Sequence, residues 1–441
     1  MNIKFGFLAF LAIYALLFFS CEWLFGNDDE KKDDNNGIKN LGNIKEHITG
    51  SNSVDFAYAR NIWDMQLFGN RIYIGYGSWA NSSPSGAINR GPIPIIAIDT
   101  ETDQFVREEV YAFDRDGVLT HRPRGADDEQ IWRFRIINGN LYIPGTDARG
   151  RFGTEDEPEW NWGNFYVRQS DGTWVRWRTI PGGLHVFDIV AFNGKLYTGI
   201  GGNGDIEGSR GVMYSSDEGI SWSAPANFTV ISRHYTLIEW GDSLYCFAGN
   251  SARRATVGGQ PRTRLRGTVI DKNDRATDDA VLGIFVDLLD EGNYIVRKYS
   301  FVGDTLAFIL YKRGDHNDSW EESAGLFFTK ELSASGTVSK ARLPNQDAVA
   351  INTISRNNNE FAYILANIKN ANDYTVIVYK TIDFITFEEC LSFSFGTFAR
   401  SFEEHNGNFY FGMGTMDGIS PSELSGTVLK IPFEAAGKSF R

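Results

Sequence analysis

The sequence predicts an all-β protein, a seven-bladed β-propeller of four-stranded antiparallel blades. The first observation behind this prediction is a phrase in which an Asn-Gly pair separates two apolar, β-prone runs, as in residues 192–201. An Asn-Gly pair between such runs is the strongest short-range sign of a β-hairpin. Copies of the phrase occur at 137–143 and 405–411, and looser copies occur at 69–74, 241–245, 303–308 and 358–363.

The second observation is the even spacing of these phrases. Aligned on the turn, they place equivalent residues at positions 70, 139, 194, 242, 304, 359 and 407. The positions are on average about 56 residues apart, and repeats of that period indicate propellers or solenoids. Each period has room for a second hairpin, which gives four strands per blade. Few sequence patterns in the chain favour helices. A single ring of β-sheets can therefore contain all seven repeats.

The expected strands are clear in the first repeat and incomplete in the last. The first repeat has β-prone runs at 62–68, 71–76, 93–99 and 104–111. In the last repeat only the run at 426–433 follows the hairpin, so a fourth strand is missing. We expect residues near 50–60 to supply this strand and to close the ring.

Residues 1–20 have the features of a targeting segment. Lys4 gives a short positive start, and residues 5–19 form a continuous apolar run, as in a signal peptide. The segment ends Phe18-Phe19-Ser20-Cys21, which resembles the end of a bacterial lipoprotein signal. The resemblance implies lipidation at Cys21 and a lipid-anchored protein of the cell envelope, at the outer membrane and facing the periplasm or the outer surface. An ordinary cleaved signal peptide is the alternative.

The chain therefore divides into a lipoprotein signal peptide at 1–20, a flexible acidic tether at 21–50 and the propeller at 51–441. The tether is predicted from a polar stretch with few apolar residues, which includes the charged run at 28–34. Only Cys246 and Cys390 remain in the propeller. We expect them to be buried free thiols, because two cysteines make no disulfide framework.

A motif in the third repeat supports the same architecture. Residues 215–222 read Ser-Ser-Asp-Glu-Gly-Ile-Ser-Trp, which resembles the Asp-box of sialidase-like and kelch-like propellers. Degenerate copies lie around Asp171 and Asp383, at the same place in their repeats. Asp217 is expected to fold onto nearby backbone amides, with Gly219 at positive φ. The resemblance implies the fold and no sialidase activity, because the arginine motif of that family is not recognisable.

The composition disfavours several classes of function. The formal net charge is −13, which argues against generic binding to nucleic acid or to anionic lipid. We therefore expect membrane association through the lipid anchor only. The sequence has no His-x-x-x-His or Cys-x-x-Cys motif and no phosphate-binding glycine motif, so we expect no metal site and no cofactor. We expect a monomer.

A row of polar residues stands six positions before each turn. The row is Asp64, Arg133, Asp188, Thr236, Lys298, Thr353 and Ser401, and the next position is apolar or aromatic in every repeat. Because successive side chains of a strand point to opposite faces, we expect a buried apolar row beside a solvent-exposed polar row. The first strand of each blade should line the central channel, which places the polar row near the mouth where these strands begin. A wet channel wall explains such a row, but its mixture of acids and bases also indicates a ligand or mutual pairing.

Long loops are predicted at the same mouth, mainly around the first four blades. They carry the remaining candidates for ligand binding, which are His121, Arg122, Arg149, Trp162, His185 and Arg253. Exposed Trp offers a flat face to sugar rings, and Arg binds carboxylates through two parallel hydrogen bonds. The alternative is that the Trp side chains pack the loops onto the blades and that the arginines are solvated.

These features favour a binding module that presents its loop-rich face to a glycan or to an envelope protein. A first alternative is a glycoside hydrolase or polysaccharide lyase that acts on an acidic glycan through the charged ring. A second alternative is a structural platform for protein–protein interactions. The paired carboxylates of glycosidases stand roughly 5–10 Å apart, and the sequence does not place Asp64 and Asp188 at such a distance. We therefore assign no catalytic residue.

Overall fold

The computed structural model shows an all-β chain. It describes residues 37–48, 61–77, 93–113, 119–121, 125–128, 130–146, 162–201, 210–230, 233–257, 259–312, 322–415 and 422–433. Lys39–Arg441 forms one compact unit. The helical element in the described part is η1(Ile44–His47), a single 3-10 turn, and no described helix is long and apolar enough to cross a membrane. Cys21, Arg122, Arg149 and the segment 51–60 lie outside the described residues.

Every predicted hairpin is present and antiparallel. The pairs are β2(Ile62–Phe68) with β3(Arg71–Tyr76), β8(Arg135–Ile137) with β9(Asn140–Pro144), β12(His185–Phe192) with β13(Lys195–Gly201), β15(His234–Trp240) with β16(Ser243–Ala248), β20(Tyr294–Val302) with β21(Thr305–Lys312), β24(Ala348–Arg356) with β25(Phe361–Lys369), and β28(Ala399–His405) with β29(Asn408–Met413). At the Asn193-Gly194 turn both residues have positive φ, 50° and 73°. Asn and Gly tolerate this conformation, which matches the twist of the two strands.

The outer strands are less regular than uniform four-stranded blades. β4(Ile95–Asp99) and β5(Phe105–Glu108) complete one four-stranded sheet, and β26(Tyr374–Thr381) and β27(Glu388–Phe395) complete another. β10(Trp162–Arg168) and β11(Trp174–Pro181) join β6(Val110–Phe113) and β7(Leu119–His121) in a six-stranded sheet, whereas β14(Val212–Ser215) ends a three-stranded one. β17(Ala252–Val257), β18(Gln260–Asp271), β19(Ala276–Phe285), β22(Glu322–Thr329) and β23(Thr337–Lys340) belong to a nine-stranded sheet. The nine-stranded sheet arises because β17 pairs with β20 and β19 pairs with β23.

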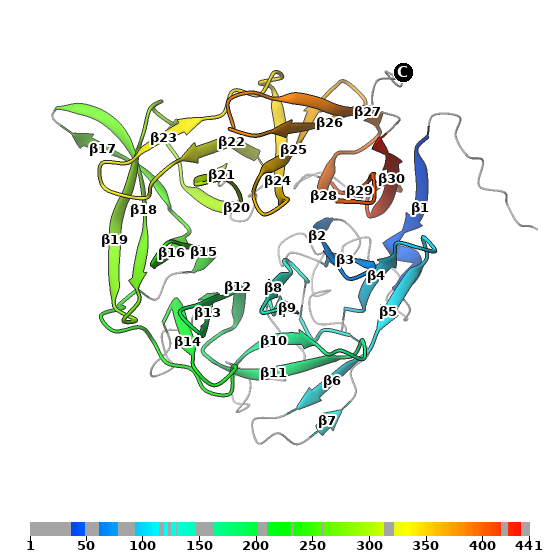
Figure 1. Cartoon of the computed structure of the whole chain (residues 1–441), viewed down its shortest axis with the longest axis horizontal. Coiled ribbons are helices and arrows are strands. Elements are labelled where there is room, and N and C mark those ends of the chain that lie inside the picture. Colours follow the sequence, from blue (N-terminus) through cyan, green and yellow to red (C-terminus); the bar gives the residue numbers. More distant parts are fainter. Residues whose placement is uncertain are drawn as a thin grey trace, which may run out of the picture. The chain divides into compact units, whose positions relative to one another are not determined.

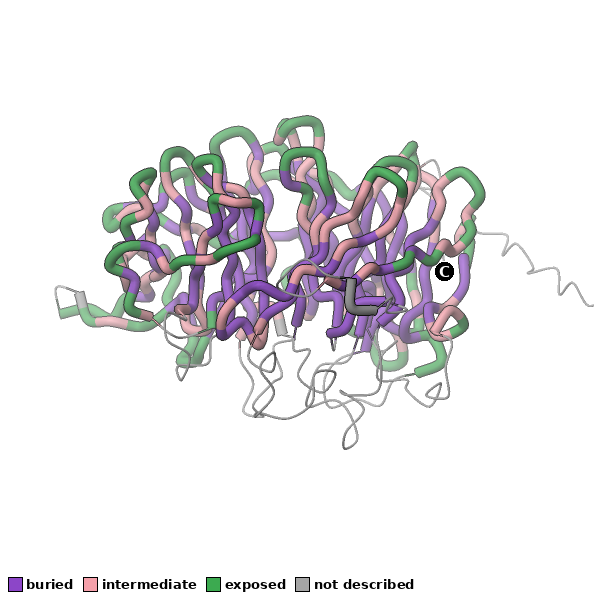
Figure 2. The backbone as a smooth tube through the Cα atoms, turned by 90° about the horizontal axis from the view of Figure 1, so that it is seen from below, coloured by how far each residue is buried: buried purple, intermediate pink, exposed green. Residues whose placement is uncertain are grey.

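The sheets are arranged in a ring, and we call its centre the channel (Figure 1). The first strand of each hairpin lies towards the centre, and the later strands of each sheet lie further out. Seen from the side, buried residues run through the middle of the strands and exposed residues lie at the turns (Figure 2). Cys246 and Cys390 are both buried and unpaired, as expected. The β-propeller-like arrangement therefore gives every first strand a face towards the channel.

The strand that completes the last sheet differs from the prediction. β1(Lys39–Asn43) pairs with β30(Thr427–Pro432), and the order of that sheet is β1-β30-β29-β28. The predicted tether at 21–50 is thus too long, because its last part is strand and 3-10 turn with Ile44 fully buried. Leu41 in β1 and Ile44 in η1 are the buried apolar anchors of this segment.

The turn at 215–222 has the local hydrogen bonds expected from its sequence. Ser221 N–H donates to Asp217 Oδ1 at 2.9 Å, and the Trp222 indole N–H donates to the Gly219 carbonyl at 3.1 Å. Gly219 has a φ of 94°, a conformation that favours glycine. Burial raises the pKa of Asp217, but hydrogen bonds from Ser215 and Ser221 outweigh it and lower the pKa to about 2. The Asp217 carboxylate therefore stabilises the turn by accepting hydrogen bonds from Ser215 and Ser221.

Candidate functional site

The predicted polar row is buried inside the ring. Asp64, Arg133 and Asp188 are 6%, 3% and 0% exposed, and Lys298 keeps 24% of its side chain exposed. In the hairpins that begin with β2, β12, β15 and β28, a β-bulge directly precedes the row. A bulge re-aims side chains and increases local twist. The row is thus mostly a set of packed polar groups, of which Lys298 keeps the exposed fraction given above.

Arg133 and Asp188 form the centre of a buried ion-pair network. Arg133 Nη1 lies 2.5 Å from Asp188 Oδ2, and Arg133 Nη2 donates to the Arg297 carbonyl and, at 3.3 Å, to Thr236 Oγ1. Arg135 adds a two-pronged contact, with Nε 2.8 Å and Nη2 2.7 Å from the two oxygens of Asp188. Two guanidinium groups therefore share one fully buried carboxylate.

Several residues of the inner strands also connect neighbouring blades through the backbone. Phe134 N–H donates to Asp64 Oδ2 at 2.8 Å, and Leu237 N–H donates to Asp188 Oδ2 at 2.9 Å. Leu67 N–H donates in the same way to Glu403 Oε2 at 3.0 Å. The innermost strand of a blade is usually the edge strand of its sheet. The N–H groups on its unpaired edge therefore need acceptors from outside the sheet. Carboxylates from the adjacent blade satisfy them, which explains part of the row as a structural device.

The surroundings lower the pKa values of both Asp188 and Lys298. Burial raises the pKa of Asp188, but Arg133 and Arg135 outweigh it, and the pKa lies below its ordinary value. Burial lowers the pKa of Lys298, and its ion pair with Asp64 offsets this only in part. Asp188 is therefore held as a carboxylate at neutral pH.

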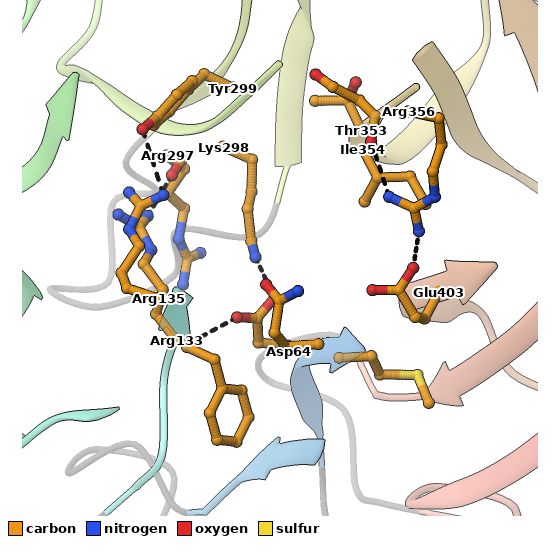
Figure 3. Close-up of a pocket in the computed structure, with 14 residues that line it drawn as sticks. Asp64, Arg133, Arg135, Arg297, Lys298, Tyr299, Thr353, Ile354, Arg356 and Glu403 are labelled. Atoms are coloured by element: carbon orange, nitrogen blue, oxygen red, sulfur yellow. Dashed lines mark hydrogen bonds and ion pairs between the residues drawn. The ribbon is translucent and has the colours of Figure 1, made fainter. Parts of the chain in front are cut away.

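A cavity of about 230 Å³ lies in the channel beside this network (Figure 3). Its lining includes Asp64, Met65, Gln66, Arg133, Phe134, Arg135, Arg297, Lys298, Tyr299, Thr353, Ile354, Ser355, Arg356 and Glu403. Gln66, Ser355 and Glu403 come after the polar row in their strands, so the cavity extends towards the hairpin turns. We predicted the site at the opposite mouth, where the strands begin and where the long loops lie outside the described residues.

The cavity also contains charged residues that do not belong to the aligned polar row, namely Arg135, Arg356 and Glu403. Arg135 and Arg356 each keep 21% of the side chain exposed, so water reaches both groups. Arg356 pairs with Glu403, and Arg135 Nη1 donates to Tyr299 Oη at 3.3 Å. Arg135 and Glu403 stand four positions before their turns, two after the polar row and on the same face of the strand. Extending the alignment by two residues would have found them.

The other side of the polar row is filled by aromatic and arginine side chains. The residues seven positions before the turns are Trp63, Trp132, Phe187, Tyr235, Arg297, Asn352 and Arg400. The guanidinium carbon of Arg297 lies 3.9 Å from the Trp132 ring centroid, and that of Arg400 lies 4.5 Å from Trp63. These cation–π contacts leave a cavity of only about 30 Å³. The 230 Å³ cavity is thus separated from the mouth that we predicted.

The structure places the remaining candidates away from the cavity lining. Trp162 begins β10 and is half-buried, and His185 begins β12 with its ring 5.6 Å from that of Phe187. Arg253 lies in β17 and is exposed, 4.0 Å from Asp279. For His121 the structure describes the backbone in β7 and not the side chain. Asp64, Arg133 and Lys298 are therefore the sequence candidates that line the cavity, with Asp188 behind them.

The chemistry of the cavity favours recognition of an anion. Five of its lining side chains are cationic and two are carboxylates, and both carboxylates pair with a cation, Asp64 with Lys298 and Glu403 with Arg356. Neither carboxylate of the lining is therefore without a cationic partner. No group of three or more His, Cys, Asp or Glu side chains in the described ranges could hold a metal ion.

Comparisons with known proteins give likenesses in shape only. The chain is similar to hydrazine synthase from Kuenenia stuttgartiensis, at 13% identity over 88% of this chain and 97% of that chain, with a TM-score of 0.45. It is also similar to the extracellular domains 1–2 of Drosophila semaphorin 1a (9% identity, 86% of each chain, TM-score 0.43) and to an oligogalacturonate lyase in complex with manganese (10% identity, 86% of this chain and 83% of that chain, TM-score 0.40). No protein-family model and no curated protein sequence matches the chain. At such low identities and TM-scores, none of these likenesses tells what the chain does.

Proposed function

We propose that this protein is a seven-bladed β-propeller that binds an acidic sugar residue in its central channel. The observation that carries the proposal is the 230 Å³ cavity with five cationic side chains in its lining, inside a chain whose net charge is −13. Such a local reversal of charge attracts anions. The seven antiparallel hairpins around the channel support the blade count.

The size and lining of the cavity suit one sugar ring that carries a carboxylate. Pockets for drug-sized ligands measure roughly 300–1,000 Å³, so a cavity of about 230 Å³ suits a single sugar residue at the end of a chain or a free acidic monosaccharide. Arg135 and Arg356 would bind the carboxylate, since guanidinium groups match its geometry. Tyr299 can donate its hydroxyl hydrogen to a sugar oxygen, and Met65 and Ile354 offer apolar surface to the ring.

The binding test uses acidic and neutral monosaccharides with two cavity variants. Arg135→Gln should weaken binding of glucuronate or galacturonate roughly ten- to a hundredfold, because it removes a charge-assisted contact. Tyr299→Phe keeps the ring and should weaken binding roughly two- to tenfold. Calorimetric titration gives the affinities, with glucose as the neutral ligand.

The matched control is Tyr245→Phe, which removes a hydroxyl from a half-buried tyrosine outside the cavity lining. It should leave the affinity unchanged. Melting curves of all variants separate loss of binding from loss of folding. Equal binding of glucose and glucuronate by the unmodified protein would refute the proposal.

A lyase acting on an acidic glycan is the second candidate function. The observation that favours it over hydrolysis is the Arg135–Tyr299 contact of 3.3 Å. In a β-elimination the arginine would neutralise the sugar carboxylate and the Tyr299 phenolate would take the proton from the adjacent carbon. A carbon–carbon double bond would form as the bond to the glycosidic oxygen breaks, and that oxygen would leave with a proton from water. The paired states of Asp64 and Glu403 argue against the two-carboxylate chemistry of glycosidases. Incubation with polygalacturonate, followed by ultraviolet absorbance of unsaturated products, tests this. Absence of products would leave the protein a binding module.

The lipid anchor belongs to the same proposal. Its support is the apolar run at 5–19 followed by Ser20-Cys21, and it places the protein at the cell envelope with a glycan or an envelope protein as partner. Cys21→Ser should move the protein from the membrane fraction to the soluble fraction, because the acylated residue is lost. Fractionation and immunoblotting measure this, with Cys246→Ser as the control. Unchanged membrane association of Cys21→Ser would exclude the anchor.

A further inference from the structure

A second charged surface lies on the hairpin of β17 and β18, none of whose residues lines the cavity. The two strands carry Arg253, Arg254, Arg262, Arg264 and Arg266 and no acidic residue before Asp271. They pair along the whole of β17, with Arg253 opposite Arg264 and Ala255 opposite Arg262. β17 pairs with β20 only at Ala252, and the hairpin extends outward from the ring (Figure 1). The hairpin is therefore an exposed, strongly basic extension.

Four of these arginines share one face of the hairpin. Directly opposite residues of an antiparallel pair lie on the same face, as do residues two apart in one strand. This places Arg253, Arg262, Arg264 and Arg266 together, and we call them the arginine face. Thr263 and Leu265 are buried on the other side, where Arg254 Nε donates to the Leu289 carbonyl at 2.7 Å.

The arginine face lowers the stability of the fold through repulsion between like charges. Arg253 and Arg264 stand directly opposite each other, and like charges in that position are destabilising. Asp279 lies within 2.7 Å of Arg266 and 4.0 Å of Arg253, so one carboxylate serves both. An anionic ligand bound between the guanidinium groups of Arg253 and Arg264 would relieve this repulsion.

We propose that the arginine face is a docking surface for an acidic polysaccharide. Arg262, Arg264 and Arg266 are spaced about 6.8 Å apart along β18, and such a row suits an extended chain with recurring carboxylates or sulfates. Guanidinium groups bind such anions through paired hydrogen bonds. Neither strand contains an aromatic residue, whereas single-stranded nucleic acid is bound mainly by stacking on aromatic side chains. This surface is independent of the channel cavity, and the proposed function does not depend on it.

The test compares polysaccharide binding by two double variants of the full chain. Arg262→Gln/Arg264→Gln removes two charges from the arginine face. Arg275→Gln/Arg342→Gln removes two charges from exposed positions elsewhere and serves as the matched control. Affinities for polygalacturonate and heparin are measured with and without free galacturonate in excess, which by the proposed function occupies the channel cavity. Binding that persists with galacturonate present belongs to the arginine face. Dextran is the neutral polymer.

The first variant should bind both polyanions roughly a hundredfold more weakly, about tenfold for each charge-assisted contact, and its binding should depend less on salt. The control should bind like the unmodified protein. Equal weakening in both variants would mean a diffuse charge effect and would overturn the proposal. So would stronger binding to anionic lipid vesicles or to single-stranded DNA than to the polysaccharides. Aggregation of the first variant with unchanged binding would assign the arginines to protection of an edge strand.

Discussion

Asp188→Asn should lower the free energy of unfolding by about 3–5 kcal/mol at neutral pH, the usual effect of removing one partner from a buried ion pair. The substitution keeps the size of the side chain but leaves Arg133 and Arg135 next to each other without their shared carboxylate. Arg133 is 3% exposed, so water cannot replace the lost charge. Chemical denaturation followed by tryptophan fluorescence measures the change.

The same variant should also remove part of the acid sensitivity of the protein. The folded pKa of Asp188 lies below its ordinary value, so its contribution to stability is present above the unfolded pKa, near 4. That contribution is lost as the pH falls through the lower, folded pKa. The stability difference between the unmodified protein and Asp188→Asn should therefore shrink below about pH 4.

Asp242→Asn is the control for both measurements, because Asp242 is exposed in a hairpin turn. Its effect should stay within about 0.5 kcal/mol. A similarly small effect for Asp188→Asn would mean that the polar row is not a structural network. In that case the row would become the first place to look for ligand contacts.

Deleting residues 1–48 should abolish cooperative melting and promote aggregation. The deletion removes β1 and with it the burial of Leu41 and Ile44, about 1.5–3 kcal/mol of stabilisation for each side chain. It also removes Lys39, which pairs with Asp103 at 2.8 Å and so connects the strand to another sheet. β30 would become an edge strand with unpaired backbone groups, which invites association between chains.

Deleting residues 1–38 is the matched control, because it keeps β1 intact. This shorter deletion should melt like the full chain in scanning calorimetry. If both truncated chains melt cooperatively at the same temperature, β1 does not close the ring. Aggregation is measured by light scattering at the same protein concentration for both chains.

The sequence alone determined the hairpins, their turns and the row that faces the channel. These features depend on local physics, since the Asn-Gly turn fixes the register and the alternation of side chains follows from the strand. The alignment therefore predicted the positions of Asp64, Arg133, Asp188 and Lys298 in one row. It also contained the signal for Arg135 and Glu403, two residues further along the same strands.

Only the tertiary structure decided which charges pair and where the cavity lies. Lys298 pairs with Asp64 across 234 positions of sequence, and Arg133 pairs with Asp188 across 55. Such pairs depend on which inner strands face each other across the closed ring, which no local pattern specifies. The same holds for β1, whose one large apolar residue, Leu41, is too little to predict a strand until β30 offers an unpaired edge. Stacking of Arg297 on Trp132 fills one end of the channel, and so the cavity extends towards the turns.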